Sequence, residues 1–175
     1  IIIEDKVFPK RNSLEAGIQQ NLEDPEVFAQ KICRGKNIQK TDDFMIIARL
    51  ESLIAGKPME DAVNRAKIYL QAGADGIMIL SKSKSADEIF EFARHYKEIT
   101  NQLNLKKTLV CVPTTYNQTT ENELSAAGFQ IIIHANHLLR SAYKAMTETA
   151  ETILRNQRSL EVDPLCSTVR EIFKT

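Results

Sequence analysis

The sequence has no tryptophan, and only 6% of its 175 residues are aromatic, so we expect a core built from aliphatic side chains. Basic and acidic residues number 23 each, and this balance gives no electrostatic reason to expect a nucleic acid or an anionic membrane as a partner. No apolar run approaches the ~20 residues that a membrane-spanning helix needs. The hydrophobic content of 43% is that of an ordinary globular chain and excludes bulk disorder.

Cysteine is also scarce. The three cysteines, Cys33, Cys111 and Cys166, are odd in number and widely spaced, which excludes a disulfide framework and a zinc-binding pattern. Cys111 lies inside an apolar run and is predicted to be a small buried residue. This use of cysteine predicts a reducing, cytoplasmic location.

Short apolar segments recur along the chain and predict parallel strands that are covered on both faces. They occupy residues 1–3, 44–48, 76–80, 108–112 and 129–133. Helical patterns alternate with them, at residues 25–34, 59–72, 85–103, 119–127 and 137–155. The alternation predicts a series of βα units and therefore an α/β fold.

Several helix details can be predicted as well. Asp24 is the expected N-cap of the first helix, and Ser85 with Glu88 forms the pattern of a capping box. The spacing of the apolar residues predicts two inward faces. They are Ala62, Ala66, Tyr69 and Leu70 in the second helix, and Leu138, Ala142, Ala145 and Met146 in the last.

The phosphate-binding glycine signature of a dinucleotide fold is missing, because the Gly-Ala-Asp-Gly turn at 73–76 precedes its strand. Such a turn is common at the non-catalytic end of (β/α)8 barrels. We therefore predict a single partial TIM barrel over residues 1–175, supplying about the last five strands and the C-terminal helices. A start inside a strand, without methionine, predicts a preceding segment. Residues 161–175 are expected to form a terminal helix that packs on a neighbouring subunit.

In a barrel, chemistry takes place at the carboxyl ends of the strands, and polar residues gather at the predicted ends. They are Glu4, Asp5, Arg49, Glu51, Ser81, Lys82, Pro113, Thr114, Thr115, His134, Asn136 and His137. Such a mouth suits a small anionic substrate. Arg49 interrupts an apolar strand and needs an anionic partner, which the sequence leaves open between Glu4, Glu51 and a substrate.

The loop after the first strand concentrates this chemistry. Glu4 and Asp5 offer carboxylates for a divalent cation or its waters. Lys6, Lys10 and Arg11, which come later in the same loop, offer cations for an anionic substrate. Asn12 and Ser13 add neutral hydrogen-bonding groups on what is expected to be a mobile loop.

The loop sequence Glu-Asp-Lys-x-Phe-Pro-Lys-x-Asn-Ser, at residues 4–13, resembles the signature of the phosphoenolpyruvate mutase family, within the isocitrate lyase and phosphoenolpyruvate mutase superfamily. The resemblance continues through residues 47–51, 54–56, 72–78, 112–114 and 135–137. It implies a Mg²⁺-dependent interconversion of phosphoenolpyruvate and phosphonopyruvate, a reaction of phosphonate biosynthesis, in a homo-oligomer (dimer or tetramer).

The resemblance also implies roles for individual residues. Glu4 would hold metal-bound water, and Arg49 would bind the anionic groups of the substrate. Lys10, Asn12 and Ser13 would lie on a gating loop that closes over the phosphoryl group and excludes water. The related phosphonopyruvate hydrolase carries threonine at the position of Asn12, so this residue is expected to separate the two reactions.

Two departures from the family pattern accompany the match. Leu80 stands where the family has a substrate-binding histidine, and the family's main metal aspartates and Ser-Gly segment belong to strands before Ile1. The alternatives that remain open are a phosphonopyruvate hydrolase, a carbon–carbon lyase of 2-hydroxy acids from the same superfamily, and a truncated chain without activity of its own.

Overall fold

The computed structural model describes residues 1–15 and 17–174. The chain divides into two compact units, Ile1–His134 and Ala135–Thr175, and each is described by itself. The first unit holds the sheet and the predicted mouth residues, apart from Asn136 and His137, which belong to the second. The second consists of helices.

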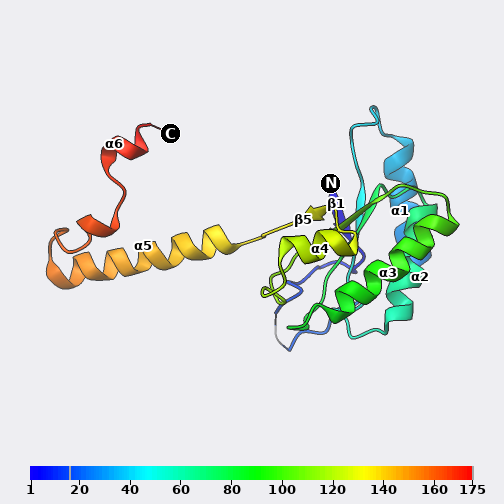
Figure 1. Cartoon of the computed structure of the whole chain (residues 1–175), viewed down its shortest axis with the longest axis horizontal. Helices are drawn as coiled ribbons and strands as arrows, with labels where there is room; N and C mark the ends of the chain where they lie inside the picture. Colours follow the sequence, from blue (N-terminus) through cyan, green and yellow to red (C-terminus); the bar gives the residue numbers. More distant parts are fainter. Residues whose placement is uncertain (16, 175) are drawn as a thin grey trace. The chain divides into compact units, whose positions relative to one another are not determined.

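Five parallel strands form one sheet in the order in which they occur along the chain (Figure 1). They are β1 (Ile2–Glu4), β2 (Ile47–Leu50), β3 (Gly76–Ile79), β4 (Thr108–Cys111) and β5 (Ile131–Ile132). Each strand is connected to the next by a helix and pairs with it in parallel. Every carboxyl end therefore lies at the same edge of the sheet. This topology is the one predicted from the alternating pattern.

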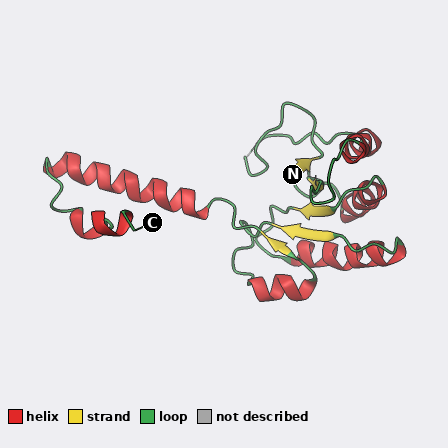
Figure 2. Ribbon diagram, turned by 90° about the horizontal axis from the view of Figure 1, so that it is seen from above, coloured by secondary structure: helices red, strands yellow, loops and turns green. Residues whose placement is uncertain are grey.

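Helices α1 to α4 follow one another along one face of this sheet (Figure 2). Their bounds are Pro25–Asn37, Met59–Gln71, Asp87–Gln102 and Glu121–Ala127. The main core lies between these helices and the strands, and it is mostly aliphatic, with Cys111 fully buried in it. The inward face predicted for α2 is confirmed, since all four of its residues are buried.

One cap prediction is confirmed and one is wrong. The carboxylate of Asp24 accepts the amides of the first turn of α1, as expected. The N-cap of α3 is Ala86, which has no capping side chain, and the hydroxyl oxygen of Ser85 accepts the amide of Asp87 at 3.3 Å. The capping box fails because the carboxylate of Glu88 accepts a hydrogen bond from Ser81 Oγ at the end of β3.

The second unit contains α5 (His137–Asn156), the short 3₁₀ helix η1 (Asp163–Leu165) and α6 (Val169–Ile172). The inward face predicted for α5 is not buried by the rest of its own unit, and Leu138 and Met146 are 87% and 63% exposed. The predicted terminal helix over 161–175 shrinks to the two short helical segments. No helix in the described part of the chain is long and apolar enough to cross a membrane.

The turn before β3 is held by the carboxylate of Asp75. One oxygen accepts hydrogen bonds from Lys36 Nζ at 2.7 Å and from the Ile46 amide at 2.8 Å, and the other lies 3.4 Å from Lys107 Nζ. Partial burial works to raise the pKa of Asp75, but the Lys36 and Ile46 hydrogen bonds and the charge of Lys107 outweigh it. The pKa of Asp75 is therefore lowered.

A carboxyl group with a lowered pKa stabilises the fold at pH values above its ordinary pKa of 3.8, and this contribution disappears as the pH falls through the folded-state pKa. Asp75→Asn in the natural full-length protein is expected to lower the free energy of unfolding by ~1 kcal/mol at pH 7. The difference from the unmodified protein should shrink as the pH falls below 3.8 and through the lowered pKa of Asp75. Urea unfolding at several pH values measures it, with the exposed Asp42→Asn as the matched control. A difference that persists in acid would contradict this role.

Candidate active site

The carboxyl ends of β1 and β2 bring the predicted site residues together. Glu4 and Arg49 are register partners in adjacent parallel strands, so their side chains lie on the same face of the sheet. A carboxylate oxygen of Glu4 lies 3.6 Å from Arg49 Nη2. Both side chains are partly exposed, at 21% for Glu4 and 26% for Arg49, which leaves them within reach of a small molecule.

Glu51 is the buried carboxylate that the cations of this cluster share. Its side chain is fully buried, and one carboxylate oxygen accepts a hydrogen bond from Arg49 Nε at 2.6 Å. The other accepts the hydroxyl of Ser13 at 2.5 Å and lies 3.3 Å from Lys6 Nζ. Two cations therefore balance a buried carboxylate, which would be costly to bury alone. The partner of Arg49 that the sequence left open is chiefly Glu51.

Asp5 forms a second layer behind Glu51. It is fully buried, and one carboxylate oxygen accepts the backbone amide of Glu51 at 2.9 Å. The other accepts the hydroxyl of Tyr69 at 2.9 Å and lies 3.2 Å from Arg65 Nη1. Burial raises the pKa of Tyr69, and the charge of Asp5 raises it further, so this hydroxyl remains a proton donor. Asp5 is a structural carboxylate rather than a free metal ligand.

The loop residues predicted to act on the substrate lie beside this network. Lys10 Nζ donates to the backbone carbonyl of Glu4 at 2.7 Å. Ser13 is buried, and its hydroxyl oxygen accepts a hydrogen bond from Arg49 Nη2 at 2.7 Å. Asn12 is exposed, and its side-chain oxygen accepts the amide of Leu14 at 2.9 Å. The loop thus brings Lys10 and Ser13 onto the strand ends and leaves the Asn12 amide at the surface.

The sequence did not predict the roles of three residues of this network. Lys6 is not available as a surface cation for a substrate, because it is only 3% exposed and points into the cluster. Gln20 and Arg65 were not singled out at all. Nothing in their local sequence could identify them, since their partners lie 14 and 60 residues away.

The face of the sheet that carries Glu4 and Arg49 becomes apolar toward β3, β4 and β5. Ile47, Met78 and Val110 form a small buried cluster against which Leu80, Val112 and Ile133 pack. Met78 is the register partner of both Arg49 and Val110, so charged and apolar halves meet along one row of residues. Leu80, at the position of the family's histidine, belongs to the apolar half.

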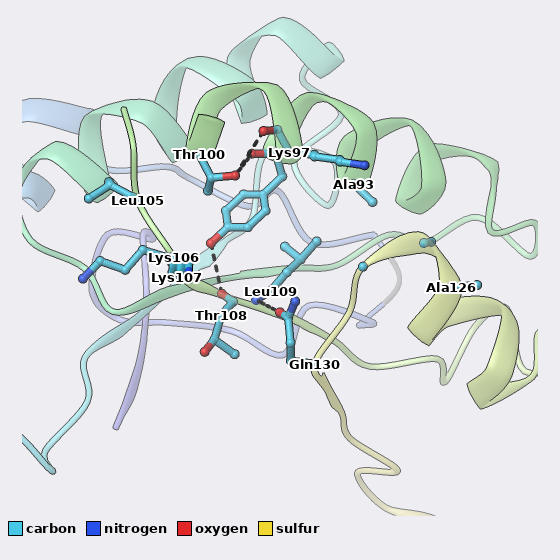
Figure 3. Close-up of a pocket in the computed structure, with 13 residues that line it drawn as sticks. Ala93, Lys97, Thr100, Leu105, Lys106, Lys107, Thr108, Leu109, Ala126 and Gln130 are labelled. Atoms are coloured by element: carbon cyan, nitrogen blue, oxygen red, sulfur yellow. Dashed lines mark hydrogen bonds between the residues drawn. The ribbon is translucent and has the colours of Figure 1, made fainter. Parts of the chain in front are cut away.

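A pocket lies away from the mouth, between α3 and α4 near the start of β4 (Figure 3). Its volume is ≈ 590 Å³, and Lys97, Lys106 and Lys107 are the charged residues among the thirteen that line it. The pocket lies at the carboxyl ends of two helices, where lysines offset the negative end of the helix dipole. It also lies at the amino ends of the strands, whereas barrel chemistry takes place at the carboxyl ends. We therefore assign the candidate active site to the mouth.

The mouth can contribute to a magnesium site but does not complete one. Glu4 offers a partly exposed carboxylate, while Asp5 and Glu51 are buried and already paired with Arg65 and Arg49. Within residues 1–15 and 17–174, no group of three or more acidic, histidine or cysteine side chains could hold a metal ion. The described residues thus suit one carboxylate contact to a metal or its waters, and no more.

Fold and site together define a parallel-stranded part of a (β/α)8 barrel with a cationic mouth at the carboxyl ends of its strands. The chain matches the family described as phosphoenolpyruvate phosphomutase over residues 1–154. It is 36% identical to the phosphoenolpyruvate phosphomutase of Tetrahymena pyriformis over 174 residues, which cover 99% of this chain and 56% of that protein. The chain belongs to the phosphoenolpyruvate phosphomutase family.

Mutases and a hydrolase resemble the chain to a similar degree. The phosphonopyruvate hydrolase of Variovorax sp. (strain Pal2) is 39% identical over 99% of this chain and 58% of its own. The crystal structure of the phosphoenolpyruvate phosphomutase of Streptomyces platensis subsp. rosaceus superimposes with a TM-score of 0.90 at 37% identity, over 99% of this chain and 57% of that one. A phosphonopyruvate hydrolase in complex with oxalate and Mg²⁺ gives a TM-score of 0.83 at 37% identity, over 99% and 56%.

These neighbours confirm the predicted fold class, an α/β chain that forms part of a TIM barrel. The chain spans rather more than half the length of the relatives it matches.

Proposed function

We propose that the natural full-length protein containing this chain interconverts phosphoenolpyruvate and phosphonopyruvate, as an isomerase of phosphonate biosynthesis. One observation carries the proposal. Arg49, Lys10 and Ser13, from a strand end and the loop at 4–13, converge on the carboxyl end of β1. Two cations with a hydroxyl group beside them suit a substrate that carries both a carboxylate and a phosphoryl group. Membership of the phosphomutase family supports the same reaction.

Each residue has a distinct task in this proposal. Arg49 keeps its guanidinium oriented through Glu51 and Ser13, and binds an anionic group of the substrate. Lys10 neutralises charge on the transferring phosphoryl group. A bound Mg²⁺ supplies stabilisation of the enolate charge that develops on the substrate. Glu4 would hold a water of that ion, and its remaining ligands would come from outside this chain.

The loop has to exclude water during the reaction. A metaphosphate-like group that leaves carbon or oxygen must be recaptured by the substrate rather than by a water molecule. Ser13 already lies buried against Glu51, whereas Asn12 is exposed at the loop surface. In the proposal Asn12 reaches the phosphoryl group when the loop closes over a bound substrate.

The second candidate function is phosphonopyruvate hydrolysis, favoured by the 39% identity to a hydrolase. A carbon–carbon lyase of 2-hydroxy acids is the more distant alternative, and a chain inactive by itself is the third. Phosphorus NMR of phosphonopyruvate with MgCl₂ distinguishes them. The natural full-length protein should yield phosphoenolpyruvate, a hydrolase would yield inorganic phosphate and pyruvate, and no change in either signal would contradict both phosphonate reactions. The 175-residue chain, tested in parallel, should be inactive.

Asn12 is expected to decide between the first two reactions. Asn12→Thr in the natural full-length protein should raise the share of inorganic phosphate among the products at least tenfold, because the shorter side chain leaves room for water at the phosphoryl group. Phosphorus NMR integrates both products in one sample. Asn21→Thr, a change of the same kind at an exposed position, is the matched control. An unchanged product ratio in Asn12→Thr would contradict the role of Asn12.

We also propose a cytoplasmic location, from the use of cysteine, and a homo-oligomer. The support for the oligomer is α5, with exposed Leu139 and Tyr143, and the tail with exposed Phe173. Apolar side chains gathered on one helix of a water-soluble enzyme suit a subunit interface. The single partial barrel domain over 1–175, with its 161–175 terminal helix on a neighbouring subunit, remains part of the proposal.

A further inference from the structure

Lys6 is the most buried cation of the mouth, and its ammonium group is surrounded by oxygen atoms. It donates to the carbonyl of Arg11 at 2.6 Å, to Ser13 Oγ at 3.1 Å and to Gln20 Oε1 at 3.1 Å. The carboxylates of Glu4 and Glu51 lie 3.4 Å and 3.3 Å away. The two carboxylates belong to the ends of β1 and β2, whereas the three hydrogen-bond acceptors belong to residues 11–20, so the hydrogen bonds of Lys6 are complete only when this segment is folded as described.

Gln20 extends this contact to the residue next to Ser13. It is 8% exposed, and its Nε2 donates to the backbone carbonyl of Asn12 at 3.0 Å while its Oε1 accepts Lys6. The side-chain amide therefore bridges a buried ammonium group and the backbone of Asn12. The bridge orients the peptide group that follows Asn12, while its side-chain amide stays at the surface.

The ends of the loop are held separately. Lys6 and Leu22 form an antiparallel bridge, the Val7 amide donates to the Asn21 carbonyl at 2.9 Å, and the Glu23 amide donates to the Asp5 carbonyl at 2.9 Å. These backbone bonds involve neither the side chain of Lys6 nor that of Gln20. Loss of the two side chains should therefore free residues 11–13 without detaching the loop from the sheet.

We infer that Lys6 and Gln20 form a clamp that holds Asn12 and Ser13 in place over the mouth, and thereby sets how often the phosphoryl group is recaptured rather than hydrolysed. Both are positioning residues, since they act through Asn12 and Ser13. The inference rests on the proposed isomerase function. It gives Lys6 a role other than the substrate contact expected from the loop motif, and it adds Gln20, which lies outside that motif. Opening the segment strips the buried ammonium group of three of its hydrogen-bond acceptors, a cost that favours the described arrangement of residues 11–20.

Gln20→Met is the sharpest test, because it keeps the length of the side chain and removes both hydrogen bonds. In the natural full-length protein we expect the share of inorganic phosphate among the products to rise about tenfold, the ratio that corresponds to the loss of the one bond that reaches Asn12, at ~1.4 kcal/mol. Lys6→Met should raise it further. Gln19→Met, at the exposed neighbouring position, is the matched control and should leave the ratio unchanged. A purely structural role would lower stability without changing the ratio.

Hydrogen exchange provides a readout that does not depend on catalysis. With oxalate and Mg²⁺ present, amides in residues 11–15 should exchange about tenfold faster in Gln20→Met than in Gln19→Met, while those of α1 stay unchanged. If neither the product ratio nor the exchange rate differs from the control, the clamp is wrong. If exchange is faster but the protein isomerises nothing, the proposed function fails while the clamp stands.

Discussion

Arg49→Met in the natural full-length protein is expected to lower kcat/KM for phosphonopyruvate on the order of a thousandfold. Arg49 contacts Glu51 at 2.6 Å and Ser13 at 2.7 Å, and its partly exposed guanidinium faces the mouth. Removing it takes away a charge-assisted bond to the substrate and leaves Ser13 with Lys6 as its remaining donor. A single preorganised donor of this kind is worth about 2.7–4 kcal/mol of transition-state stabilisation. Steady-state kinetics followed by phosphorus NMR measures the loss.

Two further variants separate the loss of binding from a loss of fold. Arg49→Lys keeps the charge but loses the forked geometry, so an intermediate loss is expected. Arg94→Met removes an exposed arginine from α3 and should leave kcat/KM unchanged. Lys6 remains beside Glu51 in the Arg49 variants, so their circular dichroism spectra should match that of the unmodified protein. An Arg49→Met protein within tenfold of normal activity would remove Arg49 from the proposed site.

Asp5→Ala is expected to produce the largest loss of stability, about 3–5 kcal/mol of the free energy of unfolding. The carboxylate of Asp5 is the shared acceptor of the Glu51 amide, the Tyr69 hydroxyl and the Arg65 guanidinium, all in a buried setting. Its removal leaves a buried cation and two further donors without their partner. Urea unfolding of the natural full-length protein provides the measurement.

A double variant tests whether this cost comes from the buried charge of Arg65. Arg65→Met removes the cation that Asp5→Ala leaves behind, so the two changes together should cost at least 1 kcal/mol less than the sum of the single changes. Arg65 keeps its bonds to Asp61 and to the Glu23 carbonyl in Asp5→Ala, which limits the effect. Strictly additive costs would show that Asp5 and Arg65 do not stabilise each other.

The strand order could be predicted because each strand is an apolar run of the right length, and parallel pairing then follows from the intervening helices. The strand predicted at 44–48 begins three residues later, at Ile47. The reason lies in a residue that is distant in sequence. The carboxylate of Asp75 accepts a hydrogen bond from the amide of Ile46, and the amide of Asp75 donates to the carbonyl of Ile46. A pattern read locally does not contain this competition.

The same distinction holds for the site. Glu4 and Arg49 could be placed together from sequence, because the carboxyl ends of neighbouring parallel strands share an edge. The buried position of Lys6 and the part played by Gln20 depend on how the loop folds back, which has no periodic signal. The failed capping box at Ser85 is a similar case, because the carboxylate of Glu88 accepts a hydrogen bond from Ser81 instead.

The backbone pairing at Lys6 and Leu22 has a consequence for how such enzymes diversify. Lys6 and Leu22 pair with each other just after β1, so the two ends of the segment between them lie side by side and are joined by backbone bonds. A recombination event can therefore exchange the whole segment as a block without disturbing strand register.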